Sequence, residues 1–103
     1  MDHDEVITIH NNRTERVDHD EKISIGDNRN TEVGKNVTTR IGKNWRVEVG
    51  DSIEFVCGKS VIRMDKDGNI SVNGHQISVG ATGEQHYQAD GNITVKGKNI
   101  LEN

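Results

Sequence analysis

The sequence predicts an all-β solenoid in which a short strand and a turn recur every eight residues. Two features of composition support this. The apolar residues are mostly β-branched, with eleven isoleucines and eleven valines but a single leucine, and such side chains suit a pleated sheet and lose χ1 freedom in a helix. Eleven glycines spread along the chain disfavour helix further. The third observation is the eight-residue repeat itself, because self-similarity at a fixed period defines the architecture.

The repeat unit of eight residues, here termed the octad, aligns similar residues in columns. One column is apolar, the next is rich in glycine, and a third, two places later, is rich in Asn, Asp and Ser. The apolar column comprises Ile9, Val17, Ile25, Val33, Ile41, Val49 and Cys57. The glycine column comprises Gly26, Gly34, Gly42, Gly50 and Gly58, after His10 and Asp18 in the first two units. Residues 1–61 are therefore predicted to form an octad-repeat β-helix.

Within each octad the apolar residues alternate with polar ones. Val37, Thr39 and Ile41 lie on one face of a predicted strand, and the intervening Thr38 and Arg40 lie on the other. The glycine and the Asn or Ser that follow are expected to turn the chain, because both accept backbone angles that β-branched residues refuse. No octad contains a hairpin dipeptide such as Asn-Gly. Strands of equal length, each followed by a corner, predict a solenoid with the shape of a prism.

A single chain of this composition would bury only a thin core. Apolar residues make up 30% of the sequence and charged residues 29%, and small domains already bury a low fraction of their surface. Disorder is the alternative for such a composition, but the ordered apolar spacing and the absence of proline argue against it. Three intertwined copies would close a triangular prism in which every inward side chain meets its symmetry mates. The sequence therefore predicts a homotrimer.

Beyond Val61 the octad loosens and a second repeat begins. An Asp-Gly-Asn-Ile motif opens residues 67–77 and returns in residues 90–100. Each copy holds two short strand signals around a turn with glycine. Residues 62–103 are therefore expected to continue the β repeat, with an irregular stretch near residues 80–90.

The column four places before the apolar column carries alternating charges. It reads Glu5, Arg13, Glu21 and Arg29, and then Val37, Trp45, Ile53 and Val61. By strand parity this column points inward. One hypothesis is a partly buried ionic ladder between neighbouring strands, because buried charges are costly unless they are paired. The alternative is a solvated corner column, in which exposed pairs would stabilise little.

Other chemistry-bearing residues favour plain structural roles. His3 and His19 share a column, so a threefold axis could gather three copies around a metal, but solvated corner histidines are the default interpretation. Cys57 fits its column as a small hydrophobe. The segment 65–69 resembles a calcium loop without its closing Glu, and a turn is predicted instead. We expect no catalytic site, no cofactor and no metal, and we expect that the chain is not an enzyme.

Charge and hydropathy argue against a nucleic-acid partner, and against a membrane span or a Sec-type signal in this sequence. The net charge of −4 has both signs interleaved, without the clustered basic patch of a nucleic-acid-binding protein, so no nucleic acid is expected as a partner. No apolar run has the length of a membrane span or of a Sec-type signal.

The octads, above all residues 12–17 and 20–26, resemble the C-terminal needle of VgrG proteins, the valine–glycine repeat spikes of bacterial type VI secretion. Needles of contractile phage tails are similar. The resemblance implies a trimeric β-helix that punctures the cell envelope, helps deliver effectors and belongs to a longer spike. It also implies partners: a PAAR-type tip protein, effector proteins, the rest of the spike with its Hcp tube, and transient contact with the target membrane. Assembly in the bacterial cytoplasm and secretion by the type VI machine would follow.

Two other functions remain open from the sequence. The same solenoid could be the stalk of a contractile phage tail spike or fibre. A polysaccharide depolymerase on a β-helix would need clustered acidic residues and aromatics on an outer face, and only Trp45 and Tyr87 are available for it.

Overall fold

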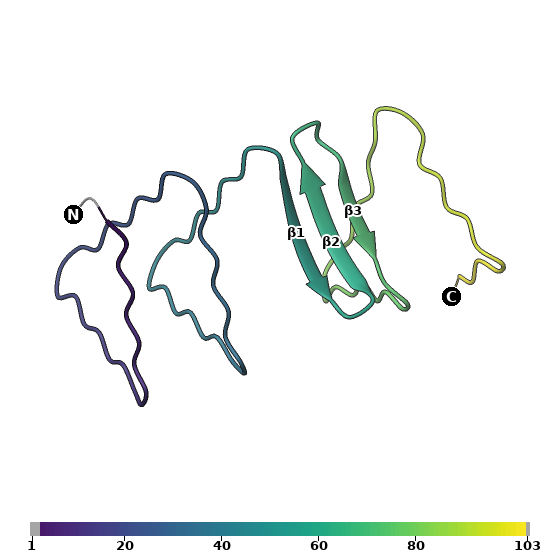
Figure 1. The fold of residues 1–103 in the computed structure, drawn as a ribbon. Coiled ribbons are helices and arrows are strands. Elements are labelled where there is room, and N and C mark those ends of the chain that lie inside the picture. The colour runs from purple at the N-terminus through teal and green to yellow at the C-terminus, as the bar shows by residue number, and fades with distance from the viewer. Residues whose placement is uncertain (1–2, 103) are drawn as a thin grey trace. The chain divides into compact units, whose positions relative to one another are not determined.

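The structure is a computed structural model, and it describes residues 3–102. By internal contacts the chain divides into two units, Met1–Gly42 and Lys43–Asn103, which are described separately. Three strands and no helix occur in the described range, which confirms the all-β prediction (Figure 1). Accordingly, nothing between residues 3 and 102 forms a helix long and apolar enough to cross a membrane.

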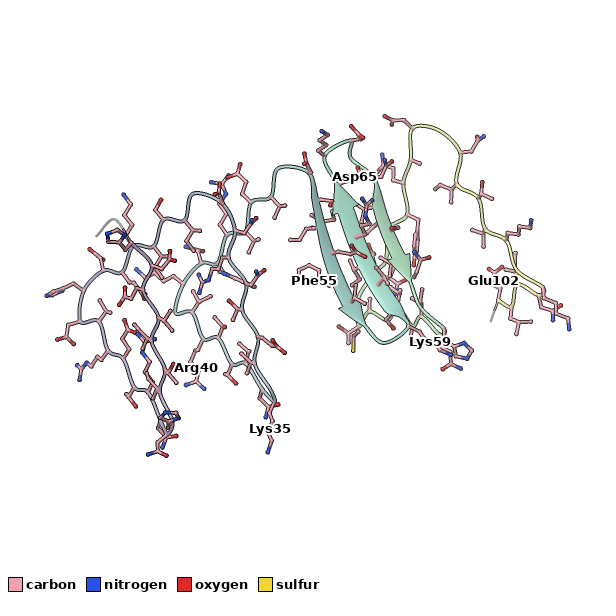
Figure 2. The ribbon with its side chains drawn as sticks, viewed as in Figure 1. Lys35, Arg40, Phe55, Lys59, Asp65 and Glu102 are labelled. Carbon is pink, nitrogen blue, oxygen red and sulfur yellow. The ribbon has the colours of Figure 1, made fainter. Side chains whose placement is uncertain are left out.

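The first unit consists of extended six-residue segments that alternate with two-residue bends. The bends lie at residues 10–11, 18–19, 26–27 and 34–35, and a further bend begins at Gly42. They recur every eight residues at the glycine column and the residue after it, and Lys35 lies at one of them (Figure 2). The described part of this unit contains no strand, because an extended segment becomes part of a sheet only when a neighbouring segment hydrogen bonds to it.

The octad glycines do not adopt a left-handed backbone at these bends. Positive φ occurs only at Gly58 and Gly68 among the described residues, so the chain bends at Gly26, Gly34 and Gly42 without a left-handed residue. A Cβ atom built at any of these three corners would meet no atom of the same chain within 4 Å. Nothing within the chain itself therefore requires glycine there.

The second unit contains an antiparallel sheet of three strands in sequential order (Figure 1). The strands are β1, Ser52–Cys57; β2, Ser60–Asp65; and β3, Ile70–Asn73. In β1 and β2, Ser52 pairs with Asp65 and Cys57 pairs with Ser60. β3 pairs with the other side of β2. β2 therefore has both of its neighbours within its own chain.

A two-residue turn at Gly58 and Lys59 connects β1 to β2. Gly58 has a φ of 55°, whereas Lys59 lies outside the positive-φ region, a pattern typical of a type II′ hairpin turn. The octad pattern predicts a corner here and contains no hairpin dipeptide such as Asn-Gly, and the prediction of a corner is wrong at Gly58. Glycine at the first central position of a two-residue loop is itself a hairpin signal. β2 consequently includes residue 61, at which the sequence predicts the end of the octad region. The division into residues 1–61 and 62–103 stays a prediction.

Asp65 organises the turn between β2 and β3. Its Oδ1 accepts the backbone N–H groups of Asp67 at 3.0 Å and Asn69 at 3.1 Å, and its Oδ2 accepts the Asn69 side-chain amide at 3.3 Å. Gly68 supplies the left-handed residue, with a φ of 90°. The backbone N–H of Lys66 donates to the carbonyl oxygen of Asp51 at 2.9 Å. The segment 65–69 therefore forms a turn, as its sequence predicts.

After Asn73 the described chain contains no further strand, but it bends in the octad phase again. A bend at 75–76 lies one residue out of this phase, whereas the bends at 82–83, 90–91 and 98 lie a whole number of octads from those of the first unit. On this segment the Tyr87 hydroxyl donates to Gln85 Oε1 at 2.9 Å, and the Gln85 amide donates to the Val79 carbonyl oxygen at 3.0 Å. The irregular path expected near residues 80–90 stays a prediction.

Candidate interface between chains

The single chain leaves its apolar residues uncovered. None of residues 3–102 is buried, and the accessible surface is 12071 Å². A folded monomeric protein of 11.5 kDa would have about 5,800 Å², roughly half of that area. Burial of the usual extent therefore requires that other chains cover the apolar residues.

The apolar column of the octads has the same environment in each repeat. Ile9, Val17, Ile25, Val33, Ile41 and Val49 are all between 43% and 50% exposed. Val6, which lies on the opposite face by parity, is 87% exposed. Each column residue is thus half covered by its own chain, and its other half is available to a neighbour. Cys57, the last member of the column, is exposed with a free thiol.

Arg13 of the predicted ladder forms an ion pair within its own octad. Its Nη2 lies 2.7 Å from Oε2 of Glu15, and the two side chains are 61% and 55% exposed. By period-two parity both residues lie on the same face as Val17, the face that is predicted to point inward. The octad columns do not single out Glu15, although a carboxylate two residues after an arginine of the predicted inward face is a signal for this pair.

The ladder column is not assembled within the single chain. No ion pair of the described residues includes Glu5, Glu21 or Arg29. A contact between residues eight apart in a prism would join neighbouring strands, and in an intertwined trimer those strands belong to different chains. The ionic ladder therefore stays a prediction.

Two ion pairs on the outward face provide a comparison. Arg16 Nε lies 2.8 Å from Asp18 Oδ1, and Arg46 Nη2 lies 3.2 Å from Glu48 Oε2. Like Arg13 and Glu15, these residues are two apart in sequence, but their side chains are 70% to 88% exposed. Such exposed pairs stabilise a fold by less than about 1 kcal/mol.

The sheet of the second unit has one largely apolar face and one mixed face, here termed the polar face, which carries charged and polar groups together with the pair of Val56 and Val61. The register places Ile53 opposite Met64 and Phe55 opposite Ile62. The apolar face comprises Ile53, Phe55, Cys57, Ile62, Met64, Ile70 and Val72, with Ser60 as its one polar side chain. Glu54 and Arg63 face each other on the opposite side. Phe55, labelled on β1 in Figure 2, is 60% exposed.

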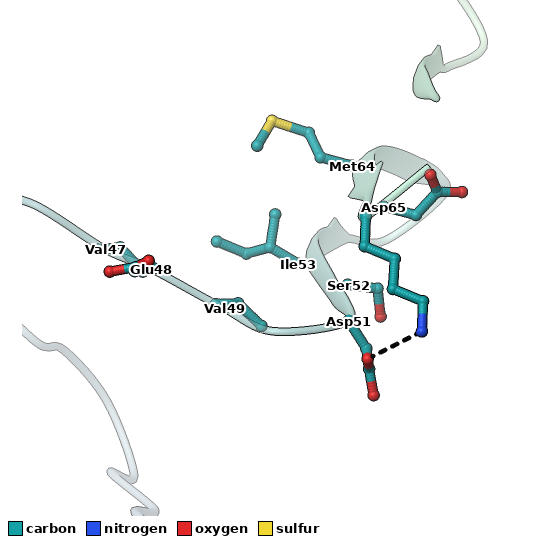
Figure 3. A pocket seen from close by; sticks show the side chains of 9 residues that line it. Val47, Glu48, Val49, Asp51, Ser52, Ile53, Met64 and Asp65 are labelled. Carbon is teal, nitrogen blue, oxygen red and sulfur yellow. Dashed lines mark ion pairs between the residues drawn. The ribbon is translucent and has the colours of Figure 1, made fainter. Parts of the chain in front are cut away.

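Two hollows border this apolar face. The first, about 250 Å³, is lined by Val47, Val49 and Ile53 of the octads and by Met64 of β2, among others (Figure 3). An ion pair of 3.5 Å between Lys66 Nζ and Asp51 Oδ1 lies beside it (Figure 3). A second hollow, about 590 Å³, is lined in part by seven apolar residues, Phe55, Val56, Cys57, Val61, Ile62, Val72 and Ile77. Octad residues and residues beyond the octads thus share the same apolar surfaces.

The other candidate residues form no chemical site in the single chain. Among residues 3–102, no three His, Cys, Asp or Glu side chains are placed to hold a metal ion. His3 and His19 are both exposed. One titratable group is clearly perturbed: hydrogen bonds from Asn69, first from its backbone and then from its side chain, lower the pKa of Asp65 below 3.8. Because these bonds close a turn, we assign Asp65 a structural role.

Comparison with known proteins identifies the octad region. A family model described as the bacteriophage T4 gp5 C-terminal trimerisation domain matches residues 1–61, which is more than half of the chain. No curated protein matches the chain. The matched region contains the whole apolar column, and a trimerisation domain accounts for the uncovered half of each column residue. The chain belongs to the family of bacteriophage T4 gp5 C-terminal trimerisation domains.

Proposed function

We propose that three copies of the chain intertwine into a triangular-prism β-helix, a segment of the envelope-puncturing needle of a type VI secretion spike. One observation carries the proposal: an apolar column that recurs every eight residues, half exposed in one chain, lies inside the region that matches a trimerisation domain. Membership of that family supports the homotrimer. The octad resemblance to VgrG needles supports the type VI assignment.

The proposed role is mechanical. In a closed prism the strands of different chains hydrogen bond along each wall, so no long sheet edge is left open to pair with other proteins. The outward face carries exposed ion pairs such as Arg16 with Asp18, which suits a rod that moves through water. Such a needle would act without catalysis and would help carry effector proteins into a target cell.

The proposal includes the partners and route that the VgrG resemblance implies. These are a PAAR-type tip protein, effector proteins, the rest of the spike with its Hcp tube, and the target membrane during penetration. The chain would assemble in the bacterial cytoplasm and leave the cell when the sheath contracts.

A second function is favoured by the family description itself, which names a bacteriophage protein. On this alternative, the chain is the β-helical stalk of a contractile phage tail spike or fibre. The octad interface would be the same, but the chain would belong to a virion.

Light scattering on the purified chain tests the assembly. We expect a mass three times the 11.5 kDa of one chain, and loss of that mass in Ile41→Asp, which would place a charge in the apolar column. Arg40→Asp, on the outward face of the same octad, should remain trimeric. A monomeric parent chain would disprove the proposal.

Location of the chain in its host distinguishes the two functions. For a type VI needle, the chain should appear in the culture medium, and deletion of the sheath gene should abolish its release. For a phage stalk, the chain should instead co-purify with tail particles and should persist in them after the secretion sheath is deleted. Mass spectrometry of both fractions measures the outcome.

A further inference from the structure

The sheet formed by β1, β2 and β3 carries the strongest unassigned surface. Its apolar face has no charged residue, and Phe55, Ile62, Met64, Ile70 and Val72 on it are between 46% and 70% exposed. A three-stranded sheet needs a covered apolar face for stability in water. Contiguous apolar patches of this kind mark interaction sites.

This face is continuous with the trimerisation region. Ile53, Phe55 and Cys57 belong to the inward octad columns and lie within the matched residues 1–61. The strand register places Ile62 and Met64 beside Phe55 and Ile53, on the same face but beyond the match.

The first hollow extends that continuity to the preceding octad. Val47 and Val49 line it together with Met64, and Ile53 and Met64 lie next to each other on adjacent strands (Figure 3). Whatever covers the octad residues Val47, Val49 and Ile53 therefore also reaches Met64.

We propose that the two other copies of this chain cover the apolar face of β1, β2 and β3, so that the trimer contact continues past residue 61 to Val72. The inference rests on the homotrimer of the proposed function. It adds that the source of the neighbouring strands changes along the chain. Up to Asp51 the neighbouring strands would come from other chains, whereas each chain builds the three-stranded wall of residues 52–73 alone. Only the outer edges of β1 and β3 remain available for backbone pairing with another chain.

The polar face agrees with this assignment. Glu54 lies opposite Arg63, and Ser71 and Asn73 occupy β3 on the same side. Arg63 Nη1 also lies 3.5 Å from Asp65 Oδ2. Val56 and Val61 also lie on this side, but its charged groups have no counterpart on the apolar face, which is therefore the surface assigned to the other copies.

Thiol reactivity in the full-length chain tests the proposal. Cys57→Val removes the single cysteine and places the usual octad residue in its column. In that background, Met64→Cys puts a thiol on the apolar face, and Arg63→Cys puts one on the polar face of the same strand. We expect the thiol at position 64 to react with a disulfide reagent at least tenfold more slowly than the thiol at position 63. The two rates should become equal in denaturant.

Light scattering on the same samples separates the possible failures. If both variants are trimers and their thiols react at equal rates, the extension past residue 61 is wrong and the trimer stands. If the parent chain itself is monomeric, the proposed function fails together with this inference.

A second pair of variants covers the case in which cysteine at position 64 disturbs folding. Ile70→Asp should lower the melting temperature of the trimer or dissociate it, and Ser71→Asp on the opposite face should leave both unchanged. Equal behaviour of this pair would also overturn the extension.

Discussion

Arg13 and Arg16 make similar contacts in one chain, but they lie on opposite faces of the same octad. Each pairs with a carboxylate two residues later, Arg13 with Glu15 and Arg16 with Asp18. In the proposed trimer only the pair of Arg13 and Glu15 would lose contact with water. A buried ion pair that loses one partner leaves an uncompensated charge.

We therefore predict different costs for Arg13→Met and Arg16→Met. Arg13→Met should destabilise the trimer by about 3–5 kcal/mol, because Glu15 would remain charged inside it. Arg16→Met should change stability by less than about 1 kcal/mol. Urea denaturation of both variants at equal chain concentration measures the difference, and equal costs would place Arg13 and Glu15 in solvent.

Asp65 makes stability depend on pH. Its hydrogen bonds with Asn69 hold the pKa of its carboxyl below 3.8 in the folded chain. The unfolded chain then binds the proton more readily, so the stabilisation is present above about pH 4 and is lost as the pH falls through the lowered pKa.

The corresponding prediction compares Asp65→Ala with Asp67→Ala at pH 7 and pH 3. Asp65→Ala should lower the melting temperature at pH 7 and should show a smaller further loss at pH 3 than the parent chain. Asp67→Ala, whose side chain closes no hydrogen bond of this turn, should follow the parent at both values. Identical acid sensitivity in all three proteins would contradict the role of Asp65.

At the scale of elements, the hairpin of β1 and β2 depends on Gly58. With a φ of 55°, an L side chain at this position is strained, by about 1–2 kcal/mol. Gly58→Ala should therefore destabilise the protein by that amount, whereas Lys59→Ala at the next position should be neutral. Thermal melts followed by circular dichroism measure both, and a neutral Gly58→Ala would argue for an octad corner in place of the hairpin.

The limits of sequence prediction are clearest at this same element. The octad period could be predicted from the sequence. The bends of the first unit recur at that period because similar residues at the same octad positions adopt the same local backbone geometry. The hairpin was missed because Gly58 occupies the column of the corner glycines. A corner and a hairpin differ in whether the next strand pairs with its own chain, and a local pattern of residue types does not encode that choice. The pair of Arg13 and Glu15 was predictable from parity.

For the whole molecule, the backbone distinguishes residues 52–73 from the octads before them. Amides of the sheet find partners within one chain, whereas residues 3–51 form no strand within one chain, and in the proposed trimer their amides would pair with strands of other chains. When the trimer is diluted to the point of dissociation, hydrogen exchange should therefore become fast first in residues 3–51 and later in residues 52–73. Exchange detected by mass spectrometry on peptides tests this order, and equal rates would contradict it.

The two reversals of the chain around β2 have a consequence for how three identical strands find their alignment. Octads resemble one another so closely that one chain could slip along its partners by eight residues and still match apolar column to apolar column. The sheet of β1, β2 and β3 interrupts that sameness at one point of each chain. In a chain that has slipped by one octad, the sheet of β1, β2 and β3 would lie beside octads of a neighbour that form no hairpin. Some apolar side chains of the sheet would then stay uncovered. The sheet would then act as a stop that permits a single alignment.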